Sequence, residues 1–350
     1  MDYETTSMLK ILCIDSANGT HINPQVYAGH CAFNCMATIT FGFRTGSISH
    51  PLVGHALALS REFMNTTGPV SNLVDFVPEY LQRTVPWAMK RRGKRLHTAL
   101  VNTYGGLVGC IERQMQAGVE QERLDDLDVA MLAAAFMVGG VETTASIIQW
   151  FSALIPTHQH VQRKAHEELD RVVGRSRLPT VQDEASMPYC RAIIKEVERC
   201  HNPFWLGTPH MATADYVHKG TLIPVGSVIL LNTWTMHHDP IKWSDPLAFN
   251  PDRYLNDSCS SSDSAKLPDP NKRDHWTFGA GRRICPGMQV ADRELWLAIT
   301  KMLWAFVMTE IPEKPIDLKE YDGKSGRSPI PFEIVLQPRF EGVEEVIRGL

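Results

Sequence analysis

The sequence predicts a mainly α-helical fold with small β-sheets. Helix-like stretches fill most of residues 25–200 and recur near the C-terminus, whereas strand-like alternation occurs only in the last half of the chain. Because strands do not alternate with helices throughout, a doubly wound parallel sheet is excluded. The length of 350 residues, 43% of them hydrophobic, allows one large domain or two or three smaller ones.

Composition narrows the class of protein. The formal net charge of -4 and the pI of about 6.4 give no global positive field, so no nucleic-acid partner is expected. The eight cysteines are scattered and are expected to be buried thiols rather than a disulfide framework. No uninterrupted apolar run reaches the roughly 18 to 20 residues of a membrane span. The first residues also lack the positive region of a signal peptide.

The first half of the chain is expected to be helical. We predict helices over 25–65 with a break near Gly42–Gly46, over 98–117, and over roughly 124–155, with a loop passing into a helix at 68–88. The middle of the 124–155 stretch is apolar on all sides, which predicts a buried helix. The basic cluster Lys90–Arg95 is interpreted as a solvated helix face, because no aromatic residues interleave it.

The second half mixes helices with short strands. We predict a helix over 158–173 ending at Gly174, a helix from about Tyr189, a hairpin over 221–234 turning around Gly226, a low-complexity surface loop over 256–274, a helix over 291–308 and a strand-like tail over 329–340.

The stretch WTFGAGRRICPG, residues 276–287, places one cysteine in a glycine-rich, positively charged loop. It begins like a dinucleotide-binding loop, but its third glycine is at the wrong distance. A structural turn with a buried cysteine is the usual alternative. A single thiolate can also be the protein ligand of a haem iron. Glycines let backbone N–H groups approach the sulfur, the following helix N-terminus favours an anion, and arginines suit haem propionates.

The ten residues FGAGRRICPG resemble the haem loop of the cytochrome P450 monooxygenases. The match is carried by Phe278, Gly281, Arg283, Cys285 and Gly287. The resemblance implies the cytochrome P450 fold and haem b, with Cys285 as the axial ligand of the iron. It also implies cofactor contacts, which we assign to Arg283, His210, Phe278 and Gly279.

Further motifs follow the order of the same family. Glu142 and Thr143, after Gly139-Gly140, resemble its oxygen-activation motif, although a glycine pair used for helix packing would look the same. Glu196 and Arg199, with Arg253 from the FNPDRYL segment, resemble its structural charge triad.

Two other sets of candidate metal ligands are interpreted as structural. The segment His237-His238-Asp239 matches a family segment with structural duties. Cys31 and Cys35 lie one helical turn apart, and we interpret them as packing residues rather than zinc ligands.

The resemblance covers the chain as a single, N-terminally truncated domain over 1–350. The family's membrane anchor, first β region and early helices are expected to be absent, and the segment near Gly118 is expected to be short. The family is anchored in the endoplasmic reticulum membrane, whereas this chain as given is assigned to the cytoplasm or left unassigned.

The resemblance implies a haem-thiolate monooxygenase that uses O2 and electrons from a separate NADPH-cytochrome reductase, docking near Arg282. Its substrate is expected to be a hydrophobic or aromatic small molecule of fungal secondary metabolism. The substrate-lining residues are expected to be Phe136, Gly140, Phe204, Trp205 and Leu206, together with Thr143. The alternative is a non-catalytic or degenerate haem-binding fragment of the same family.

Overall fold

The computed structural model describes residues 1–68, 87–112, 125–323 and 325–349. The predicted loop over 68–88 and the junction near Gly118 lie almost wholly outside these residues. The helices are α1 (Asp2–Asp15), α2 (Pro24–Phe41), α3 (Pro51–Thr67), α5 (Trp87–Leu100), α6 (Gly106–Glu112), α7 (Asp126–Thr157), α8 (Gln159–Val172), α9 (Pro188–Cys200), α10 (Thr233–His237), α11 (Ser261–Ala265), α12 (Met288–Ala305) and α13 (Val343–Arg348).

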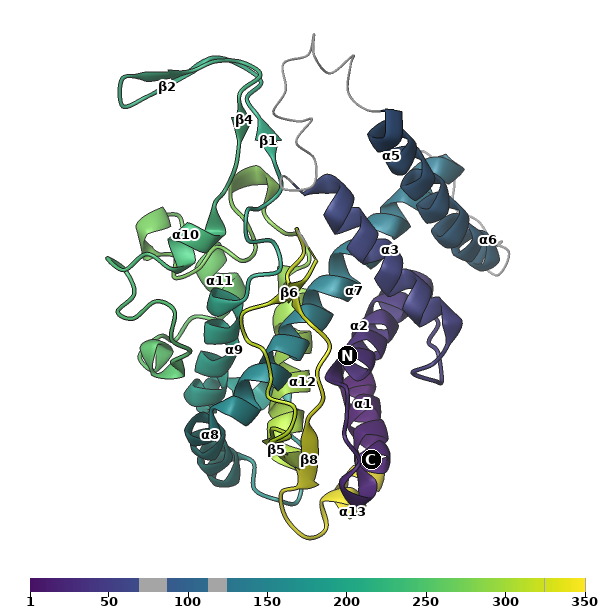
Figure 1. Ribbon diagram of the computed structural model, residues 1–350, viewed down its shortest axis with the longest axis vertical. Helices are drawn as coiled ribbons and strands as arrows, with labels where there is room; N and C mark the ends of the chain where they lie inside the picture. Colours follow the sequence, from purple (N-terminus) through teal and green to yellow (C-terminus); the bar gives the residue numbers. More distant parts are fainter. Residues whose placement is uncertain (69–86, 113–124, 324, 350) are drawn as a thin grey trace.

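The fold is mainly α-helical with small β-sheets, as predicted. Helix α7 runs through the middle of the molecule, with α2 and α3 on one side and α9 on the other (Figure 1). The largest apolar cluster joins α1, α2, α7 and α12, and it contains the fully buried Trp150, Trp296 and Trp304. This packing holds α7, which carries Glu142 and Thr143, against α12, which follows the cysteine loop.

Helix α2 shows how local signals set the boundaries. The Asn23 side chain accepts a hydrogen bond from the Gln25 N–H at 3.0 Å, and Pro24 occupies the first turn. The helix ends where Gly42 takes a left-handed conformation with φ of 71°. The predicted break near Gly42–Gly46 therefore divides α2 from α3.

Helix α1 was missed from the sequence. Its buried Thr5, Met8, Leu9 and Leu12 follow helical spacing and pack toward α12 and α2. Acidic and hydroxyl residues precede only a short apolar run in this stretch, so the sequence signal for a helix is weak.

Helix α7 is the predicted buried helix, and it keeps one open face. By length and mean hydropathy it is the only helix among the described residues that could cross a membrane, yet most of that window is buried inside the protein. It contacts α2, α3 and α12 as a core helix does. However, Leu132 and Phe136 are 50% and 48% exposed, and Ala135 and Gly139 are exposed beside them. These four residues form what we call the α7 open stripe, so the expectation that the helix is buried all round is wrong there.

The strands form four two-stranded antiparallel sheets within the described residues. The pairs are β1 (His210–Met211) with β4 (Val228–Ile229), β2 (Tyr216–His218) with β3 (Thr221–Ile223), β5 (Phe306–Thr309) with β8 (Val335–Pro338), and β6 (Tyr321–Asp322) with β7 (Ser328–Pro329). The strand-like tail is thus confirmed in β8. The predicted helix over 291–308 ends instead at Ala305, because the next residues pair with that tail.

The predicted hairpin around Gly226 is wrong in its pairing. Gly226 does turn the chain, with φ of 83°, but β3 pairs backward with β2 and β4 pairs with β1. Pro224, next to the turn, has no N–H to donate to a ladder. The partner strands carry mostly exposed residues, so their sequence lacks the alternation that would have revealed them.

The segment over 256–274 is also not a surface loop throughout. Helix α11 buries Ser261, Ser262 and Ser264. The Ser261 hydroxyl donates to a carboxylate oxygen of the buried Glu198, and the Ser264 hydroxyl donates to Asp274. Serine-rich composition resembles a solvated loop, but here the hydroxyl groups satisfy buried carboxylates.

Candidate functional site

Cys285 lies in a tight loop between Phe278 and the start of α12. The Cys285 N–H donates to the Phe278 carbonyl at 2.9 Å, which closes the loop. Gly279 and Gly281 have φ of 75° and 71°, in the left-handed region that favours glycine, and no neighbouring group lies where their side chains would be. The Phe278 ring is buried with Met288 and packs against Cys285. The loop is therefore fixed at both ends around a half-buried thiol.

The electrostatics of the loop act on the sulfur in opposite directions. Burial raises the pKa of the Cys285 thiol, whereas a backbone hydrogen bond from Gly287 lowers this pKa. Helix α12 begins at Met288, directly after Gly287, so the positive end of the helix lies beside the sulfur. A cation bound to this sulfur would deprotonate the thiol outright.

The segment leading into the loop is fastened to α9. The His237 Nε2 accepts from the Trp276 N–H at 2.7 Å, and its Nδ1 donates to the Arg199 carbonyl at 3.2 Å. Thr277 Oγ1 donates to the Glu198 carbonyl at 3.3 Å. Burial lowers the pKa of His237 well below its usual value, so its neutral ring bridges two backbone groups. The structural interpretation of this histidine is confirmed.

A second set of contacts lies beside these and was not predicted. The buried Lys195 forms ion pairs with Asp257, at 2.5 Å, and with Asp274. His275 is also buried, with its Nε2 3.5 Å from Glu198. The sequence signal was the run of ionisable residues on the buried face of α9, where a charge needs a partner.

The predicted charge triad is assembled. Glu196 and Arg199 form two parallel hydrogen bonds of 2.7 Å, and both side chains are fully buried. Arg253 reaches Glu196 Oε1 at 3.2 Å, and the Asn250 N–H donates to the same oxygen at 2.8 Å. Arg199 also donates to the His237 carbonyl at 2.8 Å. The triad therefore joins α9, the FNPDRYL segment and the histidine beneath the cysteine loop.

Glu142 and Thr143 point to different surroundings although they are adjacent. The Glu142 carboxylate is buried and accepts from Arg61 at 3.1 Å and from the Ser328 hydroxyl at 3.1 Å. Burial raises the pKa of Glu142, and the Arg61 charge lowers it, with a net rise. Arg61 is half-buried and also pairs with Asp322 at 2.8 Å. The carboxylate is therefore connected to a group that reaches the surface.

The Thr143 hydroxyl donates to the Gly139 carbonyl one turn back, at 2.5 Å. This bond uses its proton and leaves its oxygen lone pairs available. Thr143 is half-buried and continues the α7 open stripe from Gly139. The side of α7 that carries Thr143 is thus accessible to a bound molecule.

The two glycines of α7 have different neighbours. A Cβ on Gly140 would lie 2.5 Å from the Met36 sulfur, so this glycine allows α2 to pack closely. A Cβ on Gly139 would meet nothing within 4 Å. The helix-packing interpretation therefore describes Gly140, whereas Gly139 belongs to the open face.

The other predicted pocket residues lie on the chain after α9. Phe204, Trp205 and Leu206 are half-buried, and the carbonyl groups of the first two accept from the Thr233 hydroxyl at 3.2 and 2.8 Å. The Arg327 guanidinium lies 3.8 Å from the Trp205 ring centroid. His210 is exposed in β1.

A test of fit to haem rests on the donor set in and near the loop. Cys285 supplies one sulfur, with no second cysteine or histidine grouped with it among the described residues, which suits a metal already held by a macrocycle. Arg283 is exposed and forms no ion pair with any described residue, so it can receive a carboxylate. Gly279 and Gly281 leave open space beside the loop. The residues present fit the group.

Comparisons with known proteins agree with this geometry. The sequence model of the family described as cytochrome P450 matches residues 1–336. Cytochrome P450 monooxygenase pgmC of Aspergillus terreus is 35% identical over 308 residues, covering 87% of this chain and 57% of that protein. Cytochrome P450 monooxygenase verL of Clonostachys rogersoniana is 34% identical over 286 residues, covering 77% and 53% respectively.

Cytochrome P450 monooxygenase polD of Polytolypa hystricis is 31% identical over 362 residues, covering 99% of this chain and 69% of that protein. The chain thus spans between 53% and 69% of the length of these three relatives. The family match extends over nearly the whole chain, from the first helix to the strand-like tail. This chain belongs to the cytochrome P450 family.

Proposed function

We propose that this chain binds haem b through the Cys285 thiolate and oxidises a hydrophobic or aromatic small molecule with O2. A separate NADPH-cytochrome reductase supplies the electrons. The observation that carries the proposal is the cysteine loop itself, which is closed on Phe278 and supported from α9 by His237 and Thr277. The fungal monooxygenases among the relatives support the reaction class and a place in fungal secondary metabolism.

Each residue of the site has a proposed task. Cys285 holds the iron, and the Gly287 backbone and the α12 N-terminus stabilise the anionic sulfur. Arg283 and His210 hold the propionates, while Phe278 and Gly279 border the macrocycle. When bound, haem supplies dioxygen activation at a thiolate-ligated iron.

The α7 open stripe is the proposed contact for substrate. Phe136, with Phe204, Trp205 and Leu206, supplies an apolar and aromatic lining. We leave Gly140 out of this lining because it packs against Met36, and Gly139 takes its place. Thr143 accepts a hydrogen bond from the proton donor of the reaction, and Glu142 holds a proton next to the surface-reaching Arg61.

The reductase is proposed to dock near Arg282. This residue is exposed at the loop, three residues before the proposed iron ligand, whereas Arg283 is proposed to hold a propionate. A positive side chain at that place suits an acidic partner surface, and a short path to the metal suits electron transfer.

The proposal is tested with the full chain reconstituted with haem. The reduced, carbonylated protein is expected to show the red-shifted Soret band of thiolate ligation. Cys285→Ala should lose the band, because no other thiol lies in the loop. Cys13→Ser, which alters a half-buried cysteine of α1, serves as the matched control and should keep it.

Measuring substrate turnover distinguishes a monooxygenase from a non-catalytic haem-binding fragment, the two functions that the sequence allows. Substrate oxidation that requires both NADPH and the reductase supports the monooxygenase. A thiolate band without any turnover supports a non-catalytic haem-binding chain instead. A spectrum that indicates nitrogen ligation, or unchanged ligation in Cys285→Ala, would contradict the proposal.

A further inference from the structure

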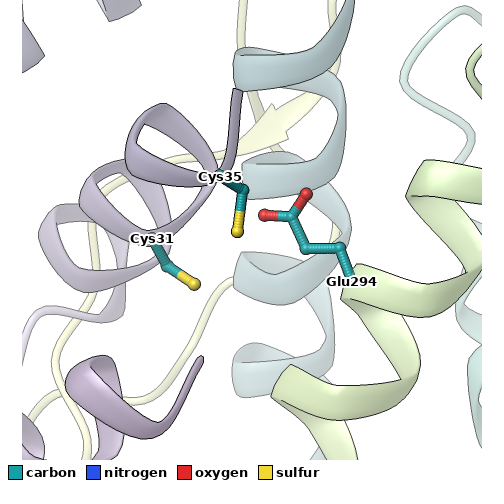
Figure 2. A group of neighbouring side chains, drawn as sticks. All are labelled: Cys31, Cys35 and Glu294. Atoms are coloured by element: carbon teal, nitrogen blue, oxygen red, sulfur yellow. The ribbon is translucent and has the colours of Figure 1, made fainter. Parts of the chain in front are cut away.

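Two thiols and one carboxylate converge in the core, apart from the cysteine loop. Cys31 and Cys35 lie one turn apart on α2, and Glu294 projects toward them from α12 (Figure 2). Their ligand atoms all lie within 4.8 Å of one another. The three side chains are 1%, 1% and 0% exposed. This is the only such group of possible metal ligands among the described residues.

Glu294 forms no ion pair with any described residue that would explain its burial. Neither carboxylate oxygen accepts a hydrogen bond from a nitrogen or hydroxyl donor, and the Cys35 thiol is the weak donor beside it. Taking an unpaired carboxylate out of water carries a large desolvation penalty, which a protein ordinarily avoids by pairing or by binding a cation. The cluster therefore lacks a positive group.

The nearby protein charges do not fill this role. Lys301 of α12 interacts electrostatically with both cysteines, but its ammonium donates to Asp2 at 2.8 Å, Thr5 at 2.9 Å and Thr6 at 2.8 Å. The α-amino group of Met1 acts on Glu294 only through space and forms no ion pair with it. The carboxylate consequently faces sulfur rather than nitrogen.

We propose that Cys31, Cys35 and Glu294 bind one zinc ion that ties α2 to α12. Zinc accepts thiolate sulfur and carboxylate oxygen together, at about 2.3 Å and 2.0–2.2 Å, and small side-chain rotations would bring the three donors to these distances. Three protein ligands leave the fourth tetrahedral position to a water molecule. The two thiol protons leave to solvent as the thiolates bind, and no electron is transferred.

The position of the site gives it a structural task. Met36, directly after Cys35 in sequence, packs against Gly140 of α7, while Glu294 lies nine residues after Cys285 on the helix that follows the loop. A zinc ion here would fix α12 relative to α2 and α7. The proposal stands apart from haem binding, because it uses none of the residues assigned to the haem.

The test measures metal in the full chain produced with zinc and haem and then passed through a desalting column. We expect about one zinc per chain by mass spectrometry. Cys285→Ala should retain this zinc, because its sulfur is not a ligand. Cys35→Ser and Glu294→Gln should each retain less than about a tenth of it, while Cys190→Ser, a buried cysteine elsewhere, is the matched control and should retain all of it.

Cobalt substitution identifies the metal ligands in the wild-type protein, so the test does not depend on variants that fold poorly. Wild-type protein refolded with Co²⁺ should show a thiolate-to-cobalt charge-transfer band, and X-ray absorption should detect two sulfur neighbours and at least one light-atom neighbour. Zinc-free wild type, unchanged zinc in Glu294→Gln, or cobalt without sulfur neighbours would overturn the proposal. A metal-free, folded chain would instead mean a neutral hydrogen-bonded group of two thiols and a carboxylic acid.

Discussion

At the scale of single residues, two neighbours on α7 have divided duties. Glu142 is engaged by Arg61 and Ser328, whereas the Thr143 hydroxyl is bonded only to the helix backbone and lies on the open side. Adjacent helix positions point about 100° apart, so an acid and a hydroxyl can be next to each other in sequence and contact different surroundings. The proposed proton path therefore has Thr143 at its inner end and Glu142 behind it.

Thr143→Ala tests this arrangement. Loss of the hydroxyl should leave haem binding unchanged and reduce product formed per NADPH consumed by about 10-fold or more, as expected when a positioned proton-transfer group is removed. The measurement compares product, NADPH and hydrogen peroxide in one reaction. Thr144→Ser, at the neighbouring buried position, is the matched control. An equal amount of product per NADPH consumed in both variants would contradict the role of Thr143.

At the scale of elements, the long, strongly patterned helices could be predicted from sequence. The bounds of α7 and α8 and the start of α9 were expected within a few residues of those observed, because apolar spacing and flanking breakers agree there. Strands β3 and β4 lie inside the predicted 221–234 hairpin, but their partners β1 and β2 could not be placed, because the exposed residues of β1 and β2 give no alternation.

The candidate site likewise has parts that could be predicted from the sequence and parts that could not. The cysteine loop and the Glu196–Arg199–Arg253 triad could be predicted because each is a compact motif of charged or special residues. The supporting contacts of Lys195 and His275, and the serine cluster of α11, could not, because they depend on which loop lies over α9. Burial of a polar residue is a property of the assembled elements and leaves little trace in a local pattern.

The glycine pair of α7 provides an element-scale prediction. Gly139→Ala should raise the free energy of unfolding of the haem-free protein by about 0.5–1 kcal/mol, since alanine is favoured in a helix and the position is open. The same change should weaken haem or substrate binding, because the methyl group enters the α7 open stripe.

Gly140→Ala is its matched comparison. A methyl group 2.5 Å from the Met36 sulfur displaces this buried side chain from its packed position, so the free energy of unfolding should fall by about 1–3 kcal/mol. Urea unfolding followed by circular dichroism measures both variants. Equal effects of the two substitutions would contradict the division between a packing glycine and an open one.

At the scale of the whole molecule, buried neutral histidines make stability depend on pH. Burial lowers the pKa of His201 to about 3, and its ring stacks on Trp150 with centroids 3.6 Å apart. His166 behaves alike, with burial lowering its pKa to about 4. Below the unfolded value of 6.5, the unfolded chain binds protons that the folded chain does not. The contribution of these histidines to the free energy of unfolding is therefore fully present above pH 6.5. It is lost as the pH falls toward their pKa values in the folded protein.

His201→Phe isolates one of these groups. Between about pH 7 and pH 5, a single such histidine accounts for about 2 kcal/mol of lost stability, and phenylalanine keeps the stacking without the titration. The variant should lose correspondingly less stability in urea unfolding at the two pH values. His160→Phe, at an exposed position, should behave as the wild type, and identical slopes for His201→Phe and the wild type would contradict the assignment.

The α7 open stripe has a consequence for the life of the chain in a cell. Until a flat apolar molecule covers Leu132, Phe136 and their neighbours, a newly made chain exposes an apolar surface in the middle of its central helix. Chaperones and proteases recognise exposed apolar surfaces, so the steady-state abundance of the protein should follow the supply of the small molecule that covers the stripe. Maturation, in that view, is completed by a small molecule rather than by the polypeptide alone.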